Sequence, residues 1–86
     1  MNRDRLIGIL KRGKNSLIVL RIVSKSDIPL SSNEIAFETG KNISSVIKIL
    51  NELEKYDGVT ETSELQRGRM YKISQTGLDV LQLLEN

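Results

Sequence analysis

The chain has 86 residues and a formal net charge of +2, and it contains neither cysteine nor histidine. This length allows one domain, spanning 1–86, with a modest core. The missing residue types exclude disulfides, thiol nucleophiles and the usual zinc and copper ligand sets, so we expect no metal site and no cofactor. The net charge is too small to indicate a class of partner by itself.

Residues 1–14 form a basic segment that is either an arm or a short helix. Four apolar side chains lie between its basic ends: Leu6, Ile7, Ile9 and Leu10. Gly8 interrupts the pattern, and an interior glycine lowers helix stability by about 1 kcal/mol relative to alanine. Residues 15–25 follow, with apolar residues nearly all round, which is typical of a helix buried on most sides. Residues 28–30 are too short for more than one bridge of a small sheet.

Residues 31–56 predict two helices joined by a tight turn. Ser31 and Glu34 have the spacing of a capping box, which starts the first helix. Gly40 is the residue type that commonly ends a helix in the left-handed conformation, and Asn42 caps the next helix. In that second helix Val46, Ile49, Leu50 and Leu53 fall on one face, and Ser44, Lys48, Asn51 and Lys55 on the opposite face.

After Tyr56 the periodicity changes to that of strands. Val59 to Leu65 and Met70 to Ser74 predict a hairpin, with Tyr71 and Ile73 inward and Met70 and Lys72 outward. We expect Gly58 to end the preceding helix. Gly68 accepts the positive φ that the hairpin loop needs, and an arginine lies on either side of it. Residues 75–86 then predict a leucine-rich last helix.

Two motifs resemble the winged helix-turn-helix of transcription regulators of the MarR/ArsR type. The first, S-x-x-E-I-A-x-x-T-G-x-x-x-S-x-V-x-x-x-L-x-x-L, begins at Ser31, and the second, Y-x-[IL]-[ST]-x-x-G, begins at Tyr71. The resemblance implies an α+β fold: a three-helix core with a helix-turn-helix at 31–56, a small antiparallel β-hairpin wing at 59–74, and a C-terminal helix at 75–86. The compact form of the chain is similar to small archaeal, plasmid or viral regulators. No apolar run is long enough for a signal-peptide core or a membrane span, so we expect a cytoplasmic, nucleoid-associated protein.

The resemblance also implies a binding mode on double-stranded DNA. Helix 42–56 would lie in the major groove, and the wing at 66–69 would lie on the neighbouring backbone or minor groove. The DNA contacts implied are Lys41, Ser44, Ser45, Lys48, Asn51, Arg67, Arg69 and Lys72. The helix has no arginine, so bidentate recognition of guanine is not available from it. Without such a contact, we expect the chain to bind double-stranded DNA with sequence specificity or only semi-specifically.

Charge is divided in a way that limits where DNA could bind. Residues 1–25 carry seven basic side chains against one acid, a net of +6, whereas residues 26–66 carry three against eight, a net of −5. A DNA surface would combine the N-terminal segment, the exposed side of the second helix and the wing. The chain lacks the long flanking helices between which larger MarR-type proteins bind small ligands, so we expect no small-molecule effector.

The terminal segments predict a homodimer. They hold more apolar surface than a domain of this size is expected to bury alone, at Leu6, Leu10, Leu78, Leu81 and Leu84. Two other interpretations of residues 1–14 remain open: a frayed arm whose apolar residues cover the core, and an arm that contacts DNA.

Phe37 does not fit a simple helix-turn-helix, because it lies two positions after Ile35 and so points away from the core side. The favoured explanation is that the N-terminal segment folds over it, and the alternative is an interface with a second chain. Phe37 and the acidic middle segment favour an alternative function, a winged helix used as a protein-protein interaction module of a transcription or assembly complex.

No catalytic constellation is present, because the serines lie mainly at caps and turns. No apolar run is long enough to span a membrane.

Overall fold

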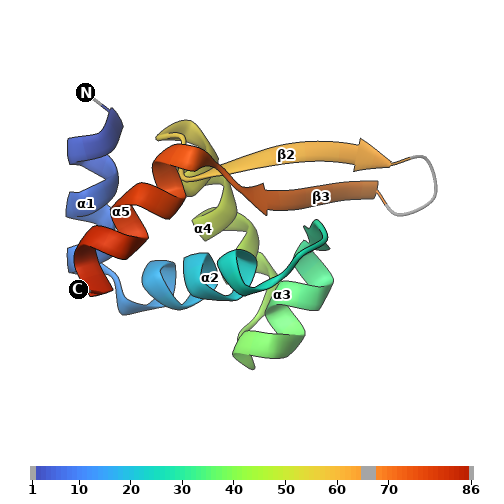
Figure 1. Cartoon of the computed structure of the whole chain (residues 1–86). Helices are drawn as coiled ribbons and strands as arrows, with labels where there is room; N and C mark the ends of the chain where they lie inside the picture. Colours follow the sequence, from blue (N-terminus) through green and yellow to red (C-terminus); the bar gives the residue numbers. More distant parts are fainter. Residues whose placement is uncertain (1, 65–67, 86) are drawn as a thin grey trace.

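The computed structural model describes residues 2–64 and 68–85. Two helices, α1 (Asn2–Arg12) and α2 (Lys14–Lys25), precede the short strand β1 (Leu30–Ser31). They are followed by α3 (Ser32–Thr39), α4 (Ile43–Lys55), the hairpin β2 (Val59–Glu64) and β3 (Gly68–Ile73), and α5 (Gln75–Glu85) (Figure 1). The predicted α+β architecture is confirmed, with the helix-turn-helix, wing and last helix close to the expected bounds.

The sheet is antiparallel and has the strand order β1-β3-β2. Leu30 pairs with Tyr71 and Ser31 with Met70, so β1 is a two-residue strand that begins at Leu30 rather than the single bridge expected at residues 28–30. The prediction that Met70 points outward is wrong, because its side chain is 0% exposed. Tyr71 is buried as well, so both faces of β3 are covered at this point, where β3 lies between two strands and contacts α2 and α3.

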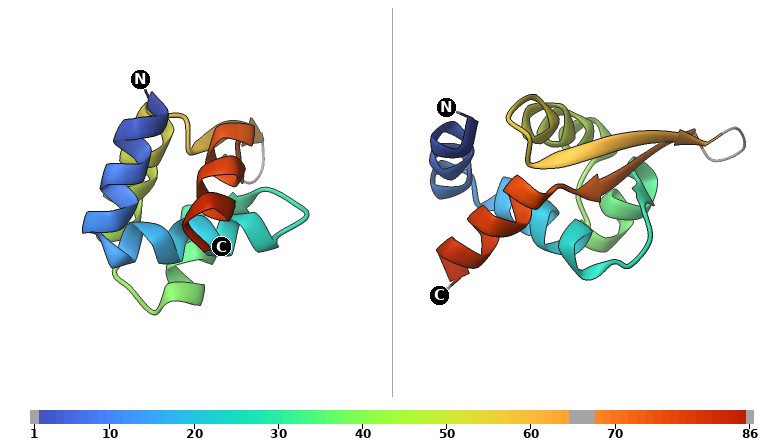
Figure 2. Two further views of the ribbon diagram at one scale, coloured as in Figure 1. Left: turned by 60° about the vertical axis from the view of Figure 1, so that its left-hand side comes forward. Right: turned by 45° about the horizontal axis from the view of Figure 1, so that its top comes forward.

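The core lies between the helices and the inner face of the sheet. It draws on α1 (Leu6, Leu10), α2 (Val19, Leu20, Val23), α3 (Ile35, Ala36), α4 (Val46, Leu50, Leu53), the sheet (Val59, Tyr71) and α5 (Val80, Leu81). The two terminal helices α1 and α5 contact each other, although they lie at opposite ends of the sequence (Figures 1 and 2). The β2–β3 wing projects away from this helical body (Figure 2).

A close junction joins the end of α4 to the start of α5. Ser74 caps α5, since the Gly77 N–H donates to its Oγ at 2.9 Å. The Ser74 N–H donates to the Gly58 carbonyl at 3.2 Å, and the Ser74 hydroxyl donates to the Asp57 carbonyl. Gly77 is buried so closely that a Cβ there would lie 2.0 Å from the Gly58 oxygen. This contact explains the glycine of the second motif.

The end of α4 differs from the prediction in one detail. The left-handed residue after the helix is Asp57, with φ 62°, rather than Gly58. Aspartate is among the few non-glycine residues that tolerate this conformation. Gly58 instead supplies space, because a Cβ on it would lie 3.0 Å from a methyl group of Leu6.

Candidate nucleic-acid interface

The start of α3 is held by a capping box. The Glu34 N–H donates to the Ser31 Oγ at 3.1 Å, and the Ser31 N–H donates back to the Glu34 carboxylate at 3.0 Å. The helix ends at Gly40, which has φ 69°. Both features confirm the prediction from local sequence. They orient α3, and α3 in turn determines where the next helix begins.

The turn between α3 and α4 is closed by hydrogen bonds on both sides. The Gly40 N–H donates to the Ala36 carbonyl at 2.9 Å, and the Lys41 N–H donates to the Thr39 hydroxyl at 3.2 Å. Asn42 caps α4, accepting from the Ser44 N–H at 2.7 Å. The N-terminal end of α4 is therefore fixed in position, which a helix that reads DNA requires.

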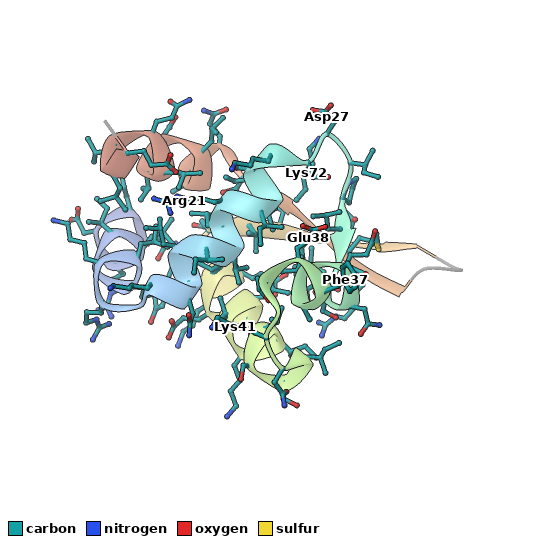
Figure 3. All side chains as sticks on the ribbon, turned by 90° about the horizontal axis from the view of Figure 1, so that it is seen from below. Arg21, Asp27, Phe37, Glu38, Lys41 and Lys72 are labelled. Carbon is teal, nitrogen blue, oxygen red and sulfur yellow. The ribbon has the colours of Figure 1, made fainter. Side chains whose placement is uncertain are left out.

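Helix α4 buries one face and exposes the other, as predicted. Val46, Leu50 and Leu53 are each 0% exposed and pack into the core. Four of the predicted contact residues are exposed on the helix: Ser44, Ser45, Lys48 and Asn51. Lys41 lies half-buried in the turn that leads into it (Figure 3). The structure therefore brings these five residues together around one helix.

Two residues of α4 were missed by sequence reasoning. Ile43 and Ile47 are each 37% exposed, one turn apart, at the N-terminal half of the helix. They lie beside the buried stripe, and their spacing alone would have assigned them to the core. Their partial exposure is visible only once the rotation of α4 against the body is known. Exposed aliphatic side chains at the start of a recognition helix can contact the methyl group of thymine.

The wing holds Arg69 in a cross-strand ion pair. Its Nε and Nη2 donate to the two carboxylate oxygens of Glu61 at 2.8 and 2.9 Å. The hydrogen bond and charge of Glu61 raise the pKa of Arg69 further above its already high ordinary value, with weaker contributions from Tyr71 and Glu54. Arg69 is therefore exposed on the wing but engaged with a carboxylate.

The other two cations predicted for the wing differ in outcome. Arg67 lies outside the described residues. Lys72 is exposed, but it lies three residues from Arg69 on the same strand, and alternation places the two side chains on opposite faces of the sheet. Figure 3 shows Lys72 well away from Lys41. The structure therefore does not bring Lys72 together with the other predicted contacts.

The basic segment at residues 1–14 folds mainly as helix α1, which covers the core. Leu6, Ile9 and Leu10 are buried, so its apolar side chains cover the core, but they do so from a helix rather than from the frayed arm that the sequence left open. The basic side chains remain exposed, and Arg5 and Arg12 line a shallow crevice of about 170 Å³ with Glu52 of α4. The helix therefore flanks the C-terminal half of α4.

The leucines predicted for a dimer interface are largely used within one chain. Leu6 is 0%, Leu10 2% and Leu81 5% exposed, so these three side chains do not form an open surface. Leu78 and Leu84 are half-buried, and Leu84 packs against the core. The expectation that a single chain cannot bury them is wrong because α1 and α5 pack on each other. Leu83, which was not singled out, is 55% exposed.

The favoured explanation of Phe37 is also wrong. Its side chain is 85% exposed, and α1 packs against α2 and α5 rather than over α3. The segment predicted to cover Phe37 is occupied elsewhere in the core. Figure 3 shows Phe37 on α3.

Within residues 2–64 and 68–85, no group of three or more acidic side chains is placed to hold a metal ion. None of the described helices combines the length and apolar character needed to cross a membrane.

The helix-turn-helix α3–α4, the hairpin wing and the flanking helices together form the winged helix-turn-helix fold of DNA-binding regulators. TubR from Bacillus thuringiensis serovar israelensis, bound to 24 bp of tubC, matches 99% of this chain and 94% of its own with a TM-score of 0.82 and 15% identity. The Staphylococcus aureus MepR-DNA complex matches 98% of this chain and 70% of its own, with a TM-score of 0.77 and 16% identity.

A third similar structure has higher sequence identity over a smaller share of its length. The ferric uptake regulator Fur of Helicobacter pylori, a protein with three functional metal binding sites, is 32% identical with a TM-score of 0.72. The match covers 85% of this chain but only 56% of Fur. No protein-family model matches the sequence, and no curated protein sequence matches it significantly. The winged-helix resemblance of the two motifs is confirmed at the level of the fold.

Proposed function

We propose that the chain binds double-stranded DNA and regulates transcription as a homodimer. The observation that carries this proposal is the exposed polar face at the N-terminal half of α4. Within the described residues, the side chains of Ser44, Lys48 and Asn51 make no hydrogen bond or ion pair, so they are available to a ligand. The same fold is seen bound to DNA in the TubR and MepR structures, which supports DNA as the ligand.

In this proposal the N-terminal half of α4 enters the major groove. Lys48 and Lys41 carry the positive charge that attracts phosphates, and either can reach a base edge. Ser44, Ser45 and Asn51 have the short polar groups that donate to and accept from bases. The helix offers no arginine for bidentate contact with guanine, so we expect moderate rather than high sequence selectivity.

Ile43 and Ile47 give α4 an apolar contribution to recognition. A thymine methyl group is the main apolar feature of the major groove, and a branched aliphatic side chain packs on it without any hydrogen bond. Because both residues are only partly exposed, they reach bases only when the helix is seated deeply. We therefore expect a preference for sites that contain thymine near the start of the helix.

The wing contributes phosphate contact through Arg69 of β3, and Arg67 is proposed as a second contact. Arg69 must exchange at least one hydrogen bond with Glu61 for one with phosphate, or use its remaining N–H groups. Arginine has five donors and only two are used in the pair. The wing then sets the position of the protein on the backbone or in the minor groove without reading sequence.

The test is DNA binding measured by fluorescence anisotropy over a range of salt concentrations. Arg69→Ala should reduce the slope of log K against log salt by about 0.9, and replacing Arg67 as well should reduce it by about 1.8 in total. Arg21→Ala is the matched control, because Arg21 pairs with Glu85 between α2 and α5, away from α4. Its slope should equal that of the wild type.

Base contacts have a different signature in the same assay. Ser45→Ala and Lys48→Ala should narrow the difference in affinity between a selected and a random duplex, because a base contact is worth about 1–3 kcal/mol only on the preferred sequence. Absence of any salt-dependent binding by the wild type would reject the DNA-binding proposal.

That result would favour the second candidate function, a protein-protein interaction module. The specific observation in its favour is Phe37, whose 85% exposure is unusual for the only phenylalanine of a small domain. The acids between residues 26 and 66 would then serve a basic protein partner. A soluble partner that binds the wild type but not Phe37→Ala, in the absence of DNA, would identify this role.

A further inference from the structure

A groove lies beside Phe37, away from the residues of the candidate DNA surface. It measures about 630 Å³ and lies between the end of α2, β1 and α3. Ile22, Leu30 and the Phe37 side chain supply its apolar lining. Phe37 itself stands at 85% exposure, so an apolar projection and an apolar hollow occupy one surface.

This surface is not covered by the rest of the chain. Helix α1 contacts α2 and α5, and α5 contacts α1 and α2, so both terminal helices are committed to the core. Ile22, Leu30 and Phe37 line one hollow rather than being scattered over the surface, and apolar residues gathered in this way mark a site of association.

The rim of the groove carries charges of both signs. Lys25, at the end of α2, and Glu38, near the end of α3, both line it. In the part of the chain that the structure describes, neither side chain has a hydrogen bond or ion pair. Glu34, the other acid of the lining, accepts from the Ser31 N–H in the capping box. One cation and one carboxylate are therefore left for a partner.

This charge arrangement selects among possible occupants. A uniformly acidic partner would be repelled by Glu38, and a uniformly basic partner would be repelled by Lys25. A second copy related by a two-fold axis presents the same surface in reverse, so each lysine can meet the opposite glutamate. In the same way, Phe37 of each copy can enter the groove of the other, because each copy carries both the projecting side chain and the groove.

We propose that this groove binds a second copy of the chain, with Phe37 of each copy inserted in the groove of the other and Lys25 of each paired with Glu38 of the other. The inference rests on the homodimer part of the proposed function and names its surface. The lining does not include Lys41, Ser44, Ser45 or Lys48, so the dimer leaves the DNA-facing side of α4 open. It places the contact on α2 and α3, rather than on the terminal leucines.

Analytical ultracentrifugation without DNA tests the proposal independently of DNA binding. The wild type should show a monomer–dimer equilibrium between micromolar and millimolar concentration. Phe37→Ala should weaken it by tenfold or more, as removal of a central aromatic contact does. Leu83→Ala is the matched control, because it removes a 55% exposed apolar side chain from α5 instead. Its association should be unchanged.

Charge reversal tests the pairing itself. K25E and E38K should each abolish self-association, because like charges then meet at both rims. The double variant K25E/E38K should associate again. An equimolar mixture of the two single variants should form a heterodimer, since one copy then presents two acids and the other two cations.

Several results would overturn the proposal. A wild type that stays monomeric at millimolar concentration would do so, as would Phe37→Ala associating like the wild type. Loss of association in Leu83→Ala alone would move the interface to the terminal helices. If the mixed variants stayed monomeric, the lysine–glutamate pairing would be wrong. Circular dichroism of each variant confirms folding, since all four positions are exposed.

Discussion

Replacing Gly77 by alanine should destabilise the domain, although alanine is the better helix former. Gly77 lies in the first turn of α5, where a Cβ would be 2.0 Å from the carbonyl oxygen of Gly58. Real Cβ contacts are essentially never closer than 3.0 Å, so the helix and the turn must separate by at least 1.0 Å, the difference between these distances. The contacting atom is backbone, so it cannot swing aside as a side chain would.

The size of the effect follows from two opposing contributions. Helix propensity favours alanine by about 1 kcal/mol. Forced separation of a packed contact costs about 1–3 kcal/mol or more, and here it also strains the hydrogen bonds of Ser74 with Gly58 and Asp57. The difference is a net loss of up to about 2 kcal/mol, equivalent to a fall in Tm of up to about 16 °C for a domain of this size.

Gly8→Ala is the matched control for Gly77→Ala. Gly8 lies in the interior of α1, and a Cβ there meets no atom within 4 Å. The same substitution should therefore stabilise the domain, by about 0.5–1 kcal/mol. Urea unfolding followed by far-UV circular dichroism measures both changes. If both substitutions changed the free energy of unfolding in the same direction, the Gly58–Gly77 contact would not be what determines the effect of Gly77→Ala.

Three other predictions concern the core, the wing and pH. Leu50→Ala should lower the free energy of unfolding by about 2–5 kcal/mol, since this side chain is 0% exposed. Lys48→Ala should change it by less than about 0.5 kcal/mol; the reverse order in urea unfolding would mean that α4 is rotated by half a turn. Glu61→Gln should tighten binding to preferred and random duplexes by the same factor in anisotropy titrations, because Arg69 no longer has to leave a carboxylate to reach phosphate. Weaker binding would contradict the proposal that the Arg69–Glu61 pair competes with phosphate. Burial raises the pKa of Tyr71 above its ordinary value of 10.0. The unfolded state therefore loses the phenolic proton at a lower pH than the folded state, so the free energy of unfolding should fall as the pH rises above 10.0. Urea unfolding at alkaline pH should show a smaller fall for Tyr71→Phe.

Local chemistry in the sequence was sufficient for the helix-turn-helix. The capping box at Ser31, the left-handed Gly40 and the cap at Asn42 each depend on residues within a few positions of one another, and all three are present. The buried stripe of α4 was likewise readable from its period. Features whose partners lie close in sequence could therefore be predicted before the fold was known.

Features with distant partners could not be predicted. Met70 is buried because β3 lies between two strands and against helices, whereas alternation along one strand treats its outer face as solvent. The Arg69–Glu61 pair joins two strands and depends on their register, which the loop composition does not reveal. Both arginines near the tip therefore appeared equally free in the sequence.

The terminal leucines illustrate the same limit for assembly. The number of apolar residues in each terminal segment indicates how much apolar surface must be buried. It does not indicate whether that surface is buried by the same chain or by a second one. The contact between α1 and α5 resolves this for Leu6, Leu10 and Leu81. Phe37 was singled out correctly as exceptional, whereas the segment expected to cover it packs elsewhere.

The contact between α1 and α5 has a consequence for how the domain folds. Helices α2, α3 and α4 are neighbours in sequence, so their contacts close short loops and can form early. Leu6 and Leu10, in contrast, share a core with Val80 and Leu81 across nearly the whole chain. Helix α1 is synthesised before α5, so its apolar face is fully covered only once α5 has also been made.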